Sequence, residues 1–341
     1  MRMNPLPAIA AVALLAGLPA CSVDDTGPTK GTAAQVKPTV SDPKDLKIAY
    51  FSAGSSNSYL QAGIAEAKTT AAELGAQIDI FDGQFSAQTQ FDQMQSAITS
   101  GRYNAFAVEP NDGNLVCNLL TQQASAKQIM VSVFNLPICG RATNAGDQTW
   151  EPGTVNYVGG QTIDVYAQWV EQVKKDHPDG AKIALISGPD LNANTIAFFE
   201  AAKAFDSEDN YQVVARQTTD YTTPKGFQAA QTILQANPDL DVIMSNFSGM
   251  SRGVVQAVNG RDVAIYDFGG DVWSLDSVRA GTLTSTVMML PRMESRKSIE
   301  GIAEVVQGID TARFVNLAES DSLPGTPFVT KDNVGLFTAE Y

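Results

Sequence analysis

From Lys47 onward, short apolar runs alternate with longer segments in which apolar residues recur every three or four positions. A short apolar run is typical of a buried parallel strand, and the recurrent spacing is typical of an amphipathic helix. Strands and helices in alternation require a parallel sheet with helices on both of its faces. The order of the segments therefore restricts this chain to α/β folds.

The first half of the chain contains one complete series of this kind. In its first helix, apolar residues from Leu60 to Leu74 share one face, and Gly75 follows at the position that usually ends a helix. Strands are expected at residues 47–52, 77–81, 105–108 and 129–133, and helices at 60–74, 87–100 and 115–126.

A second series follows an irregular stretch at residues 136–154. It consists of helices at 162–175, 193–206, 225–236 and 252–258 and strands at 182–187, 212–215, 242–245 and 263–267. Two series of similar size, each opened by a Lys-Ile-Ala strand, predict two doubly wound parallel-sheet lobes. Ligands of such sheets bind beyond the carboxyl ends of the strands, so a cleft between the two lobes is the expected site.

The amino terminus indicates export. Residues 8–18 are almost wholly apolar, but this run is shorter than the ~20 residues that span a bilayer. Leu18 to Cys21 has the Leu-x-Ala-Cys pattern of bacterial lipoprotein signal peptides, in which the cysteine receives a diacylglyceryl group and the peptide is cut before it. We expect a signal peptide at 1–20 and lipidation of Cys21. An ordinary secretory signal with an incidental cysteine is the alternative.

Residues 21–45 are polar and rich in Pro, Thr, Gly and Asp, without apolar periodicity, which predicts a flexible tether. Two acyl chains suffice for stable anchoring. We therefore expect an exported protein that is lipid-anchored to a membrane, in the periplasm or on the outer face of the cell membrane.

Charge and motifs exclude several functions. A formal net charge of −14 argues against a nucleic-acid partner, whose phosphates require clustered Lys and Arg. The nucleophile, nucleotide-loop and metal-binding motifs that mark common enzymes are absent, His177 is the only histidine, and no pair of carboxylates stands out. We expect no catalysis, no cofactor and no metal.

Cys117 and Cys139 form an even pair in an exported chain. A disulfide between them would close a loop of roughly 20 residues and contribute about 3 kcal/mol. It would hold the 136–150 loop beside the cleft and order Phe134 and Asn135. Two free, buried thiols are the alternative.

Several local motifs occur in the order and spacing of a known family. Asn57 to Leu60, after the first strand, is similar to an Asn-Pro-Phe-Phe helix start, and residues 108–112 (Val-Glu-Pro-Asn-Asp) are similar to an Asn-Pro-Thr-Asp turn. Further matches lie at 236–246, 265–271 and 286–291. From about Lys47 to the end, the chain resembles the ribose-binding branch of type 1 periplasmic binding proteins, which are the receptors of ABC importers.

The resemblance implies two lobes joined by a three-crossover hinge, with crossovers near Gly159, Met289 and Pro327. The amino-terminal lobe would comprise residues 46–158 plus 290–325, and the carboxy-terminal lobe 159–289 plus 326–341. It further implies a monomeric substrate-binding lipoprotein that captures a small neutral ligand and delivers it to an ABC transporter permease. A ligand-sensing receptor for a membrane signalling protein and an exported enzyme are the alternatives.

The resemblance also places ligand-binding positions. The charged pair that grips sugar hydroxyls in the family is replaced by Phe134 and Asn135, and the crossover glutamine by Met289. The expected ligand-binding set is Asn57, Tyr59, Phe134, Asn135, Asn194, Tyr221, Asn246, Phe247, Asp271, Trp273 and Met289. Aromatic rings with asparagines favour a neutral ligand less densely hydroxylated than a free pentose. If the register slips at the turns, Asp271 and Asn246 become sugar clamps and the ligand an ordinary aldose or polyol.

Overall fold

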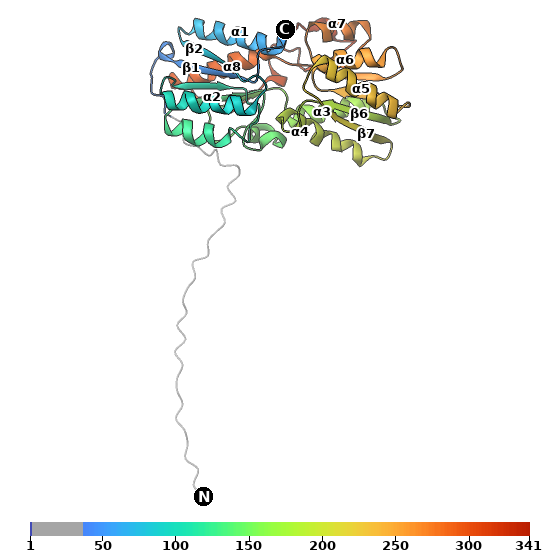
Figure 1. Ribbon diagram of the computed structural model, residues 1–341, viewed down its shortest axis with the longest axis horizontal. Coiled ribbons are helices and arrows are strands. Elements are labelled where there is room, and N and C mark those ends of the chain that lie inside the picture. Colours follow the sequence, from blue (N-terminus) through green and yellow to red (C-terminus); the bar gives the residue numbers. More distant parts are fainter. Residues whose placement is uncertain (2–36) are drawn as a thin grey trace. The chain divides into compact units, whose positions relative to one another are not determined.

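The computed structural model describes Met1 and residues 37–341. The expected signal peptide, the expected lipidation site Cys21 and most of the expected tether lie outside the described residues. Two six-stranded sheets carry the fold from residue 47 onward (Figure 1). Within the described part of the chain, no helix has the length and apolarity needed to cross a membrane.

The first sheet has the strand order β11-β5-β4-β3-β1-β2, and all of its pairings are parallel. Its strands are β1 (Lys47–Ser52), β2 (Gln77–Asp82), β3 (Ala105–Val108), β4 (Met130–Phe134), β5 (Tyr157–Gly159) and β11 (Phe314–Asn316). Helices α1 (Ser58–Glu73), α2 (Ala87–Ser100) and α8 (Pro291–Val306) pack on it. We call this sheet and its helices the first lobe.

Alternation along β1 explains how both faces of this sheet are buried. Ile48 and Tyr50 belong to the core shared with α1, whereas Ala49 and Phe51 belong to a separate core with residues of α2. Successive side chains of a strand point to opposite faces, so a strand buried on both sides is apolar at almost every position.

The second sheet has the order β12-β10-β9-β8-β6-β7, parallel except for the antiparallel pair β10 and β12. Its strands are β6 (Ala181–Ser187), β7 (Tyr211–Thr218), β8 (Val242–Ser245), β9 (Ala264–Gly269), β10 (Ser285–Met288) and β12 (Phe328–Thr330). Its helices are α3 (Ile163–Asp176), α4 (Ala193–Ala201), α5 (Thr223–Ala236), α6 (Ser248–Val258) and α7 (Val272–Ala280). These elements form the second lobe.

The chain passes between the two sheets three times: between β5 and α3, between β10 and α8, and between β11 and β12. The prediction of an α/β fold with two doubly wound, mainly parallel sheets and three connections is therefore confirmed. Each passage starts at the end of a strand, so the three connecting segments lie at the edge where the two sheets face each other.

Three helices differ from the expectation. Residues 119–124 form a π-helix (Leu119–Ala124) instead of the α-helix expected over 115–126. The apolar spacing there serves either helix type and could not distinguish them. The helix expected at 193–206 is α4, which passes into a 3₁₀ segment at Ala202–Ser207. Finally, α6 starts at Ser248, four residues before the predicted start. Its first turn contains only one apolar residue, Met250, so apolar periodicity did not indicate it.

Cys117 and Cys139 form a disulfide with their Cα atoms 4.9 Å apart, within the usual range for such bonds. The same two segments approach closely at Gly113, where an added Cβ would lie 2.4 Å from the carbonyl oxygen of Pro137. The loop after β4 is thus fixed to the loop after β3.

Candidate functional site

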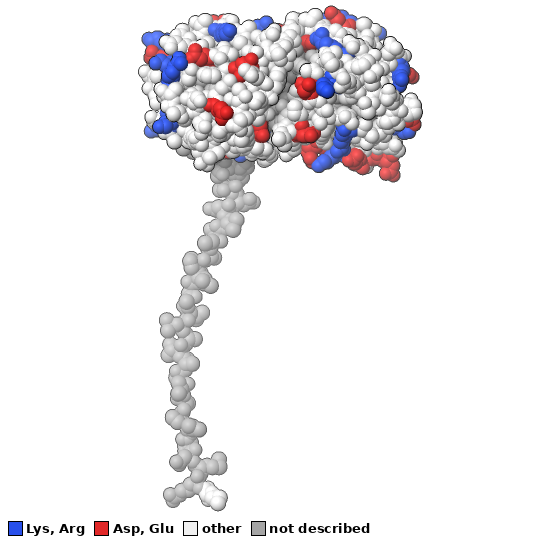
Figure 2. All heavy atoms as spheres, in the orientation of Figure 1, with Lys and Arg blue, Asp and Glu red and all other residues white. Residues whose placement is uncertain are grey.

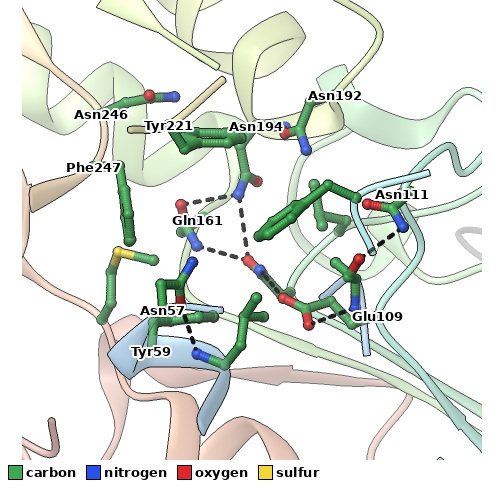
Figure 3. Close-up of a pocket in the computed structure, with 16 residues that line it drawn as sticks. Asn57, Tyr59, Glu109, Asn111, Gln161, Asn192, Asn194, Tyr221, Asn246 and Phe247 are labelled. Atoms are coloured by element: carbon green, nitrogen blue, oxygen red, sulfur yellow. Dashed lines mark hydrogen bonds between the residues drawn. The ribbon is translucent and has the colours of Figure 1, made fainter. Parts of the chain in front are cut away.

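A cavity that opens to solvent lies at the carboxyl ends of strands from both sheets, where parallel sheets favour ligand sites. The first lobe contributes Ala53, Asn57, Tyr59, Leu60, Phe85, Glu109, Asn111, Asn135 and Leu136. The second contributes Asn192, Asn194, Tyr221, Asn246 and Phe247, and the connecting segments contribute Gln161 and Met289 (Figure 3).

Eight of the eleven residues expected to bind ligand line this cavity. They are Asn57, Tyr59, Asn135, Asn194, Tyr221, Asn246, Phe247 and Met289. Most of them directly follow a strand or begin the next helix, which is the location that parallel sheets favour for ligand sites.

Three expected residues lie elsewhere. Phe134 is the last residue of β4 and packs in the core against the ring of Tyr50, with the ring centroids 5.3 Å apart. Asp271 caps the start of α7 and pairs with Arg252, whose guanidinium lies over the half-buried ring of Trp273. Successive strand residues point to opposite faces, so Phe134 points away from the cavity. The side chain of Asp271 accepts a hydrogen bond from the backbone nitrogen of Ser274 at the start of α7.

Other lining residues were not in the expected set. Glu109 and Asn111 belong to the turn after β3, and Gln161 belongs to the connection after β5, so the position of a strand end could have pointed to them. Phe85 lies in the turn between β2 and α2, and no sequence pattern singles it out.

A chain of buried side-chain amides crosses the cavity between the lobes (Figure 3). Gln161 donates from Nε2 to Oδ1 of Asn135 at 2.6 Å. Asn194, on α4, donates from Nδ2 to Oε1 of Gln161 at 2.9 Å and to Oδ1 of Asn135 at 3.3 Å. Each lobe is therefore bonded to the other through residues that line the cavity.

Two lining asparagines retain unused hydrogen-bonding atoms. Oδ1 of Asn194 is buried without a partner, and the amide of Asn246 makes no well-formed hydrogen bond, although the hydroxyl of Tyr166 lies close to it. A buried polar group left in this state costs about 1–3 kcal/mol. Both residues line the cavity, and their amides can donate and accept hydrogen bonds.

The backbone is strained at three lining positions. Phe85, Asn135 and Tyr221 have φ values of 54°, 58° and 66°, a region uncommon for residues other than glycine and unfavourable for bulky ones. The ring of Tyr221 passes over Gly188, where an added Cβ would lie 1.9 Å from the ring carbon Cζ. Because Gly188 has no side chain, the ring of Tyr221 can occupy this position in the cavity wall.

The described lining of the cavity contains one carboxyl group, that of Glu109. Glu109 accepts hydrogen bonds from Nδ2 of Asn135 at 2.8 Å and from the backbone nitrogen of Ala53 at 3.3 Å. Burial raises the pKa of Glu109, and these donors oppose the rise. No lysine, arginine or histidine lines the described cavity, so an acidic ligand would find no counter-charge.

Aromatic rings form much of the apolar wall. Tyr59 and Phe247 are perpendicular with centroids 6.5 Å apart, and Tyr221 meets Phe247 at 83° and 5.7 Å. Such faces pack well against the C–H surface of a saturated ring. Among the described residues, no group of three or more His, Cys, Asp or Glu side chains is arranged to hold a metal ion.

Comparison with known proteins places this arrangement among binding proteins. A family model described as a periplasmic binding protein domain matches residues 48–310. Ribose import binding protein RbsB of Bacillus subtilis is 24% identical over 239 residues, covering 69% of this chain and 73% of the relative. The D-allose-binding periplasmic protein of Escherichia coli is 27% identical over 244 residues, covering 66% and 72%.

Solved structures show the same fold. An ABC transporter solute-binding protein from Mycobacterium smegmatis with bound glycerol has a TM-score of 0.73 and 25% identity, covering 87% of this chain and 99% of the other. A solute-binding protein from Bacillus halodurans with bound myo-inositol has a TM-score of 0.74 and 19% identity, with the same coverage.

Proposed function

This chain belongs to the periplasmic binding protein family and is a binding protein rather than an enzyme, and on that premise we propose that it is the solute-binding component of an ABC importer. In this proposal it captures a small sugar or polyol between its two lobes and delivers it to the permease. The names of its relatives, which bind ribose, D-allose, glycerol or myo-inositol, support this ligand class.

One observation supports the proposal most strongly: the buried amide of Asn246 in the lining between the lobes, which lies close to the hydroxyl of Tyr166 but makes no well-formed hydrogen bond. An amide offers a donor and an acceptor side by side, which suits two neighbouring hydroxyl groups. Asn57 and Asn192 also line the cavity, and their side-chain oxygens cap the starts of α1 and α4. The polar lining is therefore rich in amides and suits hydroxyl groups.

The expected apolar character of the ligand is part of the proposal. Four aromatic rings line the cavity together with Leu60, Leu136 and Met289. A densely hydroxylated sugar would bury hydroxyl groups against these surfaces without partners, at about 1–3 kcal/mol each. We therefore favour a ligand with one apolar face, such as a cyclic or partly deoxygenated polyol. No arginine lines the described cavity, which disfavours an acidic ligand but not a cationic one.

Anchoring at Cys21 through the tether at 21–45 remains part of the proposal, since the family itself establishes only an extracytoplasmic binding protein. The lobe boundaries at 46–158 plus 290–325 and at 159–289 plus 326–341 are proposed with it. Mass measurement of the membrane-extracted protein would show a diacylglyceryl-modified Cys21 as its first residue. An unmodified chain cut elsewhere would contradict the anchor.

The function is tested by a thermal-shift screen over sugars, polyols, cyclic alcohols and small aromatic compounds. A ligand at a hundredfold excess over its Kd stabilises the folded state by about 2.7 kcal/mol, which gives a clear rise in Tm. Recovery of that compound chemically unchanged agrees with a binding protein, and its conversion would show an enzyme. A pull-down that captures a membrane sensor instead of permease components would favour a signalling receptor.

A further inference from the structure

Glu109 is a buried carboxylate that faces the cavity without a cationic partner. It is 2% exposed, and its carboxylate accepts hydrogen bonds from Asn135, Ala53 and Ser52. The bonds to Oε2 are long, at 3.3 Å from the Ala53 nitrogen and 3.5 Å from the Ser52 hydroxyl. The single hydroxyl hydrogen of Ser52 is donated to the carbonyl oxygen of Gly54 at 2.6 Å, so the 3.5 Å contact with Oε2 is weak and Oε2 can accept a stronger donor.

The surroundings of Glu109 supply no positive charge, and burial raises the pKa of the neighbouring Glu294 well above its usual range. Glu294, also buried, accepts a hydrogen bond from the hydroxyl of Tyr59, whose ring lines the same cavity. No basic side chain is present in the described lining. A buried charge costs free energy unless a group of opposite charge offsets it. A ligand without a positive charge would leave the carboxylate of Glu109 without such a group.

The apolar wall is also suited to a cation. Tyr59, Phe85, Tyr221 and Phe247 line the cavity, and the rings of Tyr59 and Tyr221 each meet that of Phe247 nearly at right angles. The faces of such rings attract a positive charge that has been removed from water. Asp and Glu are spread among Lys and Arg on the face shown in Figure 2. The net charge of −14 would in addition draw cations toward the protein.

We propose that the preferred ligand is an amine-bearing sugar or polyol whose protonated amino group binds the carboxylate of Glu109. This inference rests on the proposed function and specifies its ligand. Figure 3 shows Asn246 and Glu109 on opposite sides of the cavity, so a molecule long enough to reach both can present hydroxyl groups to the Asn246 amide and its amino group to the carboxylate. A neutral polyol fills the same space but leaves the charge of Glu109 unmatched.

The test is calorimetry at pH 7 with pairs of compounds that differ only by one hydroxyl replaced by an amino group. The pairs are D-glucose with D-glucosamine, D-galactose with D-galactosamine, and glycerol with 3-amino-1,2-propanediol. For at least one pair we expect the amine to bind the native protein at least about tenfold more tightly, because hydrogen bonds to charged groups are stronger than neutral ones.

The isosteric variant Glu109→Gln removes the charge and keeps the shape. We expect it to lose the preference for the amine while the affinity for the hydroxyl partner changes little. Glu319→Gln makes the same chemical change at an exposed position outside the cavity and should retain the preference, which excludes non-specific attraction by the acidic surface.

The outcomes separate this inference from the proposed function. Hydroxyl compounds that bind as tightly as their amine partners would overturn the inference and leave the sugar or polyol receptor intact. The same holds for an amine preference that persists in Glu109→Gln. If no amine, sugar or polyol binds at all, the proposed function itself fails. The comparison on the native protein decides even if Glu109→Gln does not fold.

Discussion

Nδ2 of Asn194, at the start of α4 in the second lobe, lies 3.3 Å from Oδ1 of Asn135, directly after β4 of the first lobe. The same nitrogen also reaches Gln161, on the first connecting segment, at 2.9 Å. The oxygen Oδ1 of Asn194 remains without a partner. One side chain thus bonds the two lobes to each other and keeps one buried acceptor unused. In the proposed function, a ligand that engages Asn194 would couple its binding to contact between the lobes.

Replacing Asn246 should separate stability from binding. Asn246→Leu, close in shape, removes two buried polar atoms that make no well-formed hydrogen bond. Because such atoms cost about 1–3 kcal/mol, the ligand-free variant should melt at the same temperature as the native protein or higher. Its Tm should no longer rise with ligand.

The matched control is Ser245→Ala. The hydroxyl of Ser245 is also buried without a partner, but Ser245 does not line the cavity. This variant should keep the ligand-induced rise in Tm. If Asn246→Leu binds ligand as well as the native protein does, the assignment of Asn246 to the ligand is wrong.

Gly188→Ala should weaken binding through Tyr221. The new methyl group would overlap the Tyr221 ring, which would have to leave its present position in the cavity wall. Because overpacking typically costs 1–3 kcal/mol, we expect affinity to fall by about tenfold. Gly335→Ala, where no atom lies within 4 Å of the added Cβ, is the control. Equal affinities of the two variants in calorimetry would argue against a role for Tyr221.

How far a sequence predicts such a site is shown by two neighbouring residues, Phe134 and Asn135. The end of the strand could be predicted from its apolar run. Which of the two residues there faces the cavity could not, because a shift of one residue exchanges the two faces of a strand. Asn135 faces the cavity and Phe134 the core. Asp271 shows a second limit of prediction from sequence. A polar residue after a strand can cap the next helix with its side chain instead of facing the cavity.

Phe85 could not have been predicted at all. It reaches the cavity from a turn in which Gln84 and Phe85 both have positive φ values, 52° and 54°. Apolar periodicity describes helices and strands, and it carries no signal for a conformation that only surrounding contacts maintain. Glu109 could be assigned from the sequence to the turn at residues 108–112. Its burial and its missing counter-charge are properties of the folded chain and could not be predicted.

Reduction of the Cys117–Cys139 disulfide should destabilise the first lobe and loosen the cavity. The bond closes a loop with a sequence separation of 22, which corresponds to about 3 kcal/mol. Leu136, three residues before Cys139, lines the cavity, so ligand affinity should also fall. Peptide mapping of the unreduced, alkylated protein should find Cys117 and Cys139 unlabelled. Alkylation of both would refute the bond in solution.

Stability should depend on pH through Asp267. This residue of β9 accepts hydrogen bonds from Ser251, Ser274 and Thr286, yet burial raises its pKa to about 6. The folded state therefore binds the proton more tightly than the unfolded state, in which aspartate has a pKa of about 3.9. This contribution to stability is complete below about pH 4 and is lost as the pH rises through 6, by roughly 3 kcal/mol.

Asp267→Asn has no such titration. Denaturant unfolding from pH 4 to pH 7 should show the native protein losing stability relative to this variant as the pH rises. Curves that run parallel over the whole range would show that Asp267 does not titrate differently in the two states.

The central claim is that one ligand is held by both lobes at once, and hydrogen–deuterium exchange with and without the best ligand of the thermal-shift screen tests it most directly. We predict that saturating ligand slows exchange together at residues 109–111 and 135–136 of the first lobe and at 192–194 and 246–247 of the second. Protection confined to one lobe, or found only away from these segments, would contradict the account.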